Sequence, residues 1–255
     1  HSIPATTARY FRFVYHKEGS EPGSEDLDAA RWNPALKIQG ITLSGKAMIH
    51  QYEGKNGSIW RISNRTTGQL LPDSLCVPMD RLVDISQHLD KNGILTWRVP
   101  PGDWTILRIG HTSTGHTNYI GGKGSGLECD KFDPEVVRFQ FDQWFGKAFY
   151  ETDPALSREM LKVFHVDSWE CGSQNWSPVF AGEFKKRRGY DLQDYLPVMT
   201  GLPVANAGLS EGFLCDIRQT ISELISDNFF GTMADEANAK GCLFSAESVA
   251  PVMVS

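Results

Sequence analysis

The sequence predicts an α/β protein, specifically the front portion of a (β/α)8 barrel preceded by a β-rich region. The apolar run 161–166 stops abruptly at the polar and aromatic stretch 167–170, as a buried strand does when it enters a loop. Around this run, strand-like and helix-like segments alternate, which is typical of a parallel sheet with crossover helices. We therefore divide the chain into a β-rich region, residues 1–103, and a partial barrel, residues 104–255.

Strands are expected in the first region because aromatic, β-branched and alternating residues are separated by turn signals. Residues 55–58 favour a hairpin, and Asn92-Gly93 favours a second tight turn. The expected strands are residues 8–15, 36–43, 82–86 and 94–99.

The second region opens with an expected strand at residues 104–110, and the spacing of apolar residues then becomes helical. Asp133 and Pro134 predict a helix start, with Asp as N-cap and Pro in the first turn, and the helix should run to about Glu151. Further expected elements are the strand 161–166, a helix from Ser177-Pro178 to about Arg188, a long helix capped by Ser210 and ending at Lys240-Gly241, and the strand 242–247.

The number of strands suggests an incomplete barrel. A (β/α)8 barrel typically takes about 250 residues, whereas residues 104–255 contain only three strands of the barrel type. Three strands cannot close a barrel. We therefore expect the rest of a longer polypeptide, or self-association, to cover the open strand edges.

Composition and charge argue against several classes of partner. The 255 residues carry a net charge of −6, which disfavours nucleic acid, and the basic run 185–188 precedes Gly189 as the last turn of a helix would. No apolar run approaches the ~20 residues that a membrane span needs. The five cysteines are scattered without CxxC spacing, so we expect neither a disulfide framework nor a zinc site. The chain begins at His1 without a signal peptide, as an excised or mature piece would, and we expect a periplasmic or secreted location.

Glu170 is the strongest catalytic candidate because acids in loops after parallel strands line the active sites of such folds. A carboxyl group there can protonate a glycosidic oxygen. Trp169 and Trp176, with Asn175 between them, suit a platform on which a sugar stacks. The plainer alternatives are a solvated or helix-capping glutamate and two core tryptophans. Asp167 is expected to orient its neighbours.

Other acids and histidines are weaker candidates for contacts with the sugar. Glu247 ends the next strand, and its alternative role is as partner of a buried cation. Glu128 and Asp130 follow a glycine-rich loop that lacks the ending of a phosphate-binding loop, and they alternatively supply polarity before the next helix. His111 and His116 flank the end of the strand at 104–110 and would contact sugar hydroxyls or neighbour a metal, unless they are ordinary polar histidines.

Several blocks, in the same order, resemble glycoside hydrolase family 106, the α-L-rhamnosidases. The resemblance is specific over residues 80–250 and looser over residues 1–80. The matching blocks are residues 104–112, Gly126-Leu127-Glu128-Cys129-Asp130-Lys131, Val166-Asp167-Ser168-Trp169-Glu170, Gly172-Ser173-Gln174-Asn175-Trp176 and Arg187-Arg188-Gly189-Tyr190-Asp191-Leu192.

This resemblance implies a large multidomain enzyme with a (β/α)8 catalytic barrel, calcium dependence and hydrolysis with inversion. It implies that Glu170 is the general acid and that the general base lies beyond Ser255, which makes Glu247 a substrate or metal contact. We therefore expect cleavage of terminal α-L-rhamnosides in the degradation of polysaccharides, and little activity from these 255 residues alone. Two alternatives stay open: a non-catalytic carbohydrate-binding protein, and a glycosidase of another barrel family that uses Glu170 and Glu247 as its pair.

Overall fold

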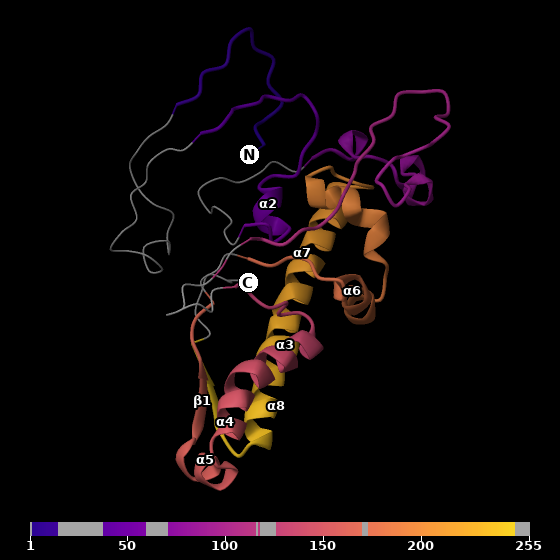
Figure 1. The fold of residues 1–255 in the computed structure, drawn as a ribbon. Coiled ribbons are helices and arrows are strands. Elements are labelled where there is room, and N and C mark those ends of the chain that lie inside the picture. Colours follow the sequence, from indigo (N-terminus) through magenta and orange to yellow (C-terminus); the bar gives the residue numbers. More distant parts are fainter. Residues whose placement is uncertain are drawn as a thin grey trace.

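The computed structural model describes residues 2–14, 38–59, 71–115, 117, 126–169 and 173–247. Within these ranges the chain combines helices with a pair of parallel strands, which confirms the α/β class in its coarse form. The helices lie to one side of the strand pair, and the long helix α7 runs away from it (Figure 1).

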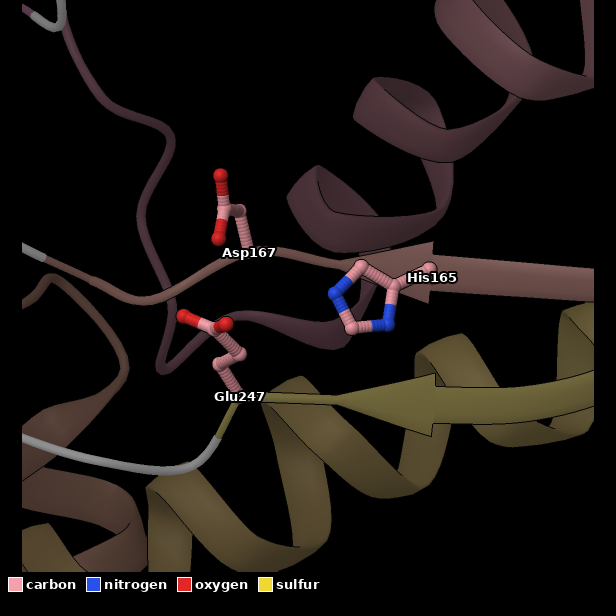
Figure 2. A group of neighbouring side chains, drawn as sticks. All are labelled: His165, Asp167 and Glu247. Carbon is pink, nitrogen blue, oxygen red and sulfur yellow. The ribbon is translucent and has the colours of Figure 1, made fainter.

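The two strands, β1 (Val163–Val166) and β2 (Leu243–Ala246), pair in parallel and in register over their full lengths. The ladder continues one residue further, since the amide of Glu247 donates to the carbonyl of Val166 at 2.9 Å. Both strands therefore end at the same edge, where Asp167 and Glu247 follow (Figure 2). The expected strands at 161–166 and 242–247 form, the first shortened at its start and the second by one residue at each end.

Alternation along the strands separates a helix-facing side from an open side. Phe164 is buried, and its ring centroid lies 4.9 Å from that of Phe141 and 4.7 Å from that of Phe145. On the opposite side Val163 and Leu243 are 50% and 69% exposed. A strand buried on both faces would have its side chains covered on each side. Within the part of the chain that the structure describes, this pair packs through the helix-facing side alone.

The helix that precedes β1 begins and ends where the sequence predicts. It comprises α3 (Pro134–Phe141), the π-helical segment η4 (Asp142–Gly146) and α4 (Lys147–Glu151). The carboxylate of Asp133 accepts from the amide of Glu135 at 2.9 Å and so caps the first turn. The short helix α5 (Pro154–Met160) follows and is capped in the same way by Asp153.

The long helix before β2 starts earlier than expected. It comprises α7 (Ala207–Leu224), the π-helical η6 (Ile225–Gly231) and α8 (Thr232–Ala239). Asn206, not Ser210, is the N-cap, because its side chain accepts from the amide of Leu209 at 2.8 Å. Ser210 is buried inside the first turns, and its hydroxyl bonds to both backbone polar groups of Val204. The prediction of the cap was wrong because any Ser or Asn ahead of the apolar stripe carries the same signal.

Between these units lie α6 (Phe180–Arg188) and the 3-10 segment η5 (Leu192–Thr200). Helix α6 starts after the expected Ser177-Pro178 and ends as predicted at Gly189, whose φ of 83° suits glycine. Its phenylalanines pack on α7 in the largest apolar cluster. That cluster consists of Ile49, Phe132, Phe180, Phe184, Leu192, Val198, Val204, Phe213, Leu214, Ile217, Ile221 and Leu224.

The first region contains turns where the sequence predicts strands. Its elements are α2 (Tyr52–Lys55), η1 (Asp73–Leu75), η2 (Met79–Arg81) and η3 (Ser86–His88). No strand forms in the described parts of the five segments expected to be strands, which are 8–15, 36–43, 82–86, 94–99 and 104–110. One isolated bridge joins Leu89 and Leu95 around the turn at Asn92-Gly93.

These strand predictions fail for a physical reason. A strand is stable only when a neighbour satisfies its backbone groups, and among the described residues only the segment 94–99 has one, through two backbone hydrogen bonds across its turn, from Asp90 to Ile94 and from Thr96 to His88. Ile94 and Ile106 accordingly stay 60% and 52% exposed. The expected hairpin at 55–58 is instead the end of α2, where the side chain of Asn56 donates to the carbonyl of Met199 at 2.7 Å. Among the described helices, none is long and apolar enough to cross a membrane.

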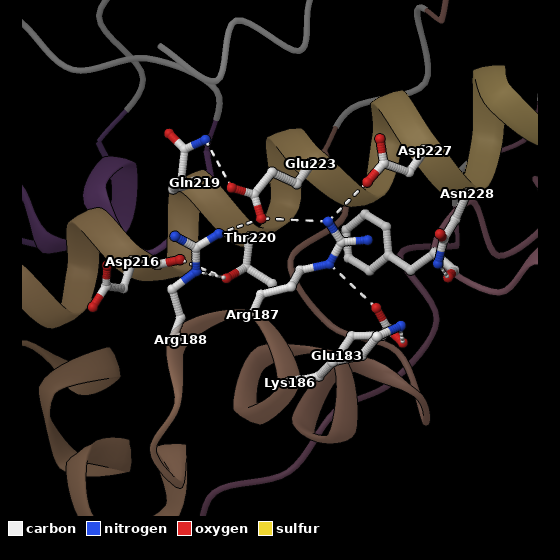
Figure 3. Close-up of polar contacts among 11 residues, drawn as sticks. Glu183, Lys186, Arg187, Arg188, Asp216, Gln219, Thr220, Glu223, Asp227 and Asn228 are labelled. Atoms are coloured by element: carbon white, nitrogen blue, oxygen red, sulfur yellow. Dashed lines mark hydrogen bonds and ion pairs between the residues drawn. The ribbon is translucent and has the colours of Figure 1, made fainter.

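The basic run at the end of α6 joins two helices. Arg187 pairs with Glu183 on its own helix and with Glu223 and Asp227 on α7 and η6, and Arg188 also bonds to Glu223 (Figure 3). The run lies in the last helical turn as predicted, and its two lysines are also paired, Lys185 with Asp191 and Lys186 with Glu183, so all four cations have acidic partners within the chain. That arrangement fits a structural role better than a surface for nucleic acid.

Replacing Glu223 with Gln should lower the free energy of unfolding by about 1–2 kcal/mol at pH 7, because two arginines lose their shared partner. The Arg188 guanidinium lowers the pKa of Glu223, so this stabilisation is present above the carboxyl's unfolded pKa and disappears as the pH falls through the folded one. Urea unfolding at pH 7 and at pH 3 measures both effects. Glu151→Gln is the control, since Glu151 makes only an exposed pair with Lys147. Equal losses in the two variants, or a loss at pH 7 that persists unchanged at pH 3, would contradict this role.

Candidate functional site

Three polar side chains converge where β1 and β2 end. His165 and Asp167 lie two residues apart and so project from the same side of their strand, and Glu247 follows the neighbouring strand. One ligand atom from each of the three lies within 4.8 Å of the others, and all three residues are exposed (Figure 2). The Nδ1 atom of His165 also lies 3.2 Å from the hydroxyl of Ser245.

This donor set can hold a cation or bind sugar hydroxyls. Calcium prefers oxygen ligands and takes about six to eight of them. The carboxylates of Asp167 and Glu247 fit that preference, whereas the imidazole of His165 does not. Sequence reasoning missed His165, although its alternation with Asp167 is the signal that would have found it.

A second group forms around Lys131, which sequence reasoning also missed. Lys131 is 2% exposed, and its ammonium bonds to the carboxylate of Glu128. The same ammonium lies 4.4 Å from the ring centroid of Trp169 and 5.4 Å from that of Phe229. Glu128 and Trp169, predicted separately as sugar contacts, are therefore linked by one buried cation. Burial raises the pKa of the neighbouring Cys129, which keeps its thiol protonated near neutral pH.

Asp130 binds protein groups on three sides. Its carboxylate accepts from the side-chain amide of Gln174 at 2.6 Å, from the hydroxyl of Ser177 at 2.6 Å and from the amide of Phe132 at 3.0 Å. The bonds from Gln174 and Ser177 hold residues 174–177 of the loop between β1 and α6, so Asp130 supports this part of the loop.

The remaining predicted contacts are also tied to the protein. Asn175 donates from its side chain to the carbonyl of Asn56 at 3.0 Å, and so fastens the loop to the turn after α2. The ring centroid of Trp176 lies 5.4 Å from that of Phe180 and 6.1 Å from that of the exposed His111. The structure brings His111 and Trp176 together as a neighbouring aromatic pair. Glu170 and His116 lie outside the described residues.

Comparison with known proteins identifies the family of the chain. The model of glycoside hydrolase family 106, described as alpha-L-rhamnosidase, matches residues 16–252. The chain belongs to glycoside hydrolase family 106. Because the matched region spans nearly the whole sequence, the strand-end acids and the Lys131 group all lie within it.

Two relatives of this family 106 chain carry glycosidase names. A protein of Formosa agariphila named "Putative beta-glucuronidase" is 34% identical over 193 residues. A solved rhamnosidase from Novosphingobium sp. PP1Y superposes with a TM-score of 0.60 and 25% identity over 81% of this chain. The chain spans 16% of the length of the first protein and 20% of the second.

The supporting function of Asp130 generates a stability prediction. Asp130→Ala should lower the free energy of unfolding by about 2–3 kcal/mol, since the buried hydroxyl of Ser177 and the amide of Gln174 lose their acceptor. Chemical denaturation measures the loss. Asp84→Ala is the control, because Asp84 accepts from the Ser86 amide at an exposed turn, and it should cost well under about 1 kcal/mol. A cost at Asp130 no larger than the control's would show that its bonds do not hold the loop.

Proposed function

We propose that this chain carries part of the active site of a glycoside hydrolase that cleaves terminal α-L-rhamnosides with inversion. The observation that carries the proposal is the convergence of Asp167 and Glu247 at the carboxyl ends of two paired parallel strands. Asp167 lies three residues before Glu170 in the sequence. Sites in folds with parallel strands are built at that edge. Membership of family 106 and the likeness to a solved rhamnosidase support the same conclusion.

In this mechanism Glu170 is the protonated acid that donates to the leaving oxygen. A carboxylate on the opposite face of the sugar activates water, and inversion requires about 6.5–9.5 Å between the two carboxyl groups. Following the family resemblance, we assign that base to a residue beyond Ser255. Asp167 and Glu247 then orient the sugar through its hydroxyls.

The charges at the strand ends favour a neutral sugar over a uronic acid. Asp167 and Glu247 contribute two negative charges, which a bound divalent cation would at most cancel, so this edge offers no excess positive charge to the carboxylate of a glucuronide. The nearby cation of Lys131 is buried and paired with Glu128, so it is not free to bind an anionic substrate. Rhamnose carries no charge. We therefore favour rhamnosides even though one relative is named as a glucuronidase.

We further propose that Asp167 and Glu247 hold a calcium ion, while His165 stays outside its ligand set. When bound, calcium supplies coordination to sugar hydroxyls and helps to fix the sugar. The protein's own contribution is to keep two carboxylates side by side, which is electrostatically unfavourable without a cation or a hydroxyl donor between them.

The two alternatives are separated by turnover measurements on aryl glycosides. A binding protein would bind rhamnose and hydrolyse nothing. A glycosidase of another specificity would prefer galactosides, glucosides or glucuronides to rhamnosides.

Glu170→Gln, made in the natural polypeptide that carries this sequence, should reduce hydrolysis of rhamnosides with poor leaving groups by about 10²–10⁴-fold. Activated aryl rhamnosides need less protonation and should lose far less. Steady-state kinetics on the two substrate classes measure the ratio, with Glu151→Gln as a variant outside the site. Equal loss on both classes would mean that Glu170 is not the general acid.

Calcium should raise the unfolding temperature of the wild-type protein by several degrees, because an ion that binds only the folded state stabilises it. The rise should vanish in Glu247→Gln and persist in Glu151→Gln. Thermal unfolding in EDTA and in millimolar calcium measures it. A rise that persists in Glu247→Gln would place the ion elsewhere, and no rise in the wild type would remove calcium from the proposal.

A further inference from the structure

A buried lysine lies against two of the side chains predicted as sugar contacts, Glu128 and Trp169. Lys131 is 2% exposed. Burying an ammonium group costs several kcal/mol unless it is well paired. Here the carboxylate of Glu128 neutralises it, and the faces of Trp169 and Phe229 cover it. Because solvent cannot reach the ammonium of Lys131, its charge interacts with these protein groups.

The lysine is anchored through its own backbone and that of the next residue. The amide of Lys131 donates to the side chain of Gln174 at 3.2 Å. The carbonyl of Phe132 accepts from the side chain of Asn228 on η6 at 2.7 Å. These bonds attach the backbone of residues 131–132 to two other parts of the fold. The position from which the lysine side chain extends is therefore fixed.

Trp169 lacks a comparable anchor. Its indole Nε1 is buried, and among the described residues it has no hydrogen-bond partner. The indole does contact a cation, since the ammonium of Lys131 lies 4.4 Å from its ring centroid. In the sequence Trp169 directly precedes Glu170.

We propose that Lys131 is a positioning residue whose buried ammonium sets the places of the Glu128 carboxylate and the Trp169 indole for sugar binding. This inference rests on the proposed function, which gives those two side chains to the sugar. One cation contacts both side chains, so removing it should leave the Trp169 indole without its contact to the ammonium and take one ion pair from Glu128.

The first test uses Lys131→Met, which keeps most of the chain length and removes the charge. Lys240→Met is the matched control, since the ammonium of Lys240 also lies over two rings, those of Phe141 and Tyr150, but not over Trp169. Acrylamide quenching of Trp169, taken as the difference between each protein and its Trp169→Phe version, should show a protected indole in wild type and Lys240→Met and an accessible one in Lys131→Met. An indole that stays protected in Lys131→Met overturns the proposal.

The second test separates positioning from mere stability in the natural polypeptide. Lys131→Met should raise KM for an aryl rhamnoside by about fivefold or more, the factor that a lost cation–π contact represents, with little change in kcat. A lower apparent kcat with unchanged KM would mean only that less enzyme is folded, and would overturn the proposal. If the wild-type protein turns over no rhamnoside, the proposed function fails. The quenching result alone then decides whether Lys131 positions the Trp169 indole.

A third measurement does not depend on the folding of Lys131→Met. In the wild-type protein the Cε protons of Lys131 should resonate upfield, because they lie over an indole ring, and Trp169→Leu should shift them back. Lysine protons at ordinary positions in the wild type would overturn the proposal.

Discussion

The parallel register between β1 and β2 is the constraint on which the site depends. Because Val166 pairs with Ala246, the next residues, Asp167 and Glu247, leave the ladder side by side. A slip of one residue would turn every side chain of one strand to the opposite face. Phe164 prevents that slip, since its ring is wedged between Phe141 and Phe145 on the helix side. Packing on one face of the sheet thus fixes the chemistry at its end.

The loop after β1 is held by charge as well as by packing. Asp130 binds the part of the loop that contains Gln174 and Ser177, and Lys131 binds the part that contains Trp169. Two adjacent residues of opposite charge, Asp130 and Lys131, therefore contact the two described parts of the loop. The acids predicted as sugar contacts divide accordingly: Asp130 supports the loop, Glu128 neutralises a buried lysine, and Glu247 faces Asp167.

Features that depend on local sequence could be predicted, and those that depend on distant partners could not. The helix from Pro134 to Glu151 follows from its cap and from apolar residues at helical spacing. The strand-end positions of Asp167 and Glu247 follow from apolar runs that stop at acids. The strand expected at 104–110 has the same apolar pattern but no ladder partner among the described residues, and a pattern cannot report a missing partner. The burial of Lys131 was equally invisible, because a lysine in a polar segment normally indicates exposure.

A crystal structure of the natural protein with L-rhamnose bound tests the central claim most directly, since it shows which side chains the sugar contacts. We predict that sugar hydroxyls lie within hydrogen-bonding distance of the carboxylates of Asp167 or Glu247, at the carboxyl ends of β1 and β2. A sugar bound elsewhere, with these two carboxylates facing only solvent or protein, would contradict the assignment of this edge as the glycoside site.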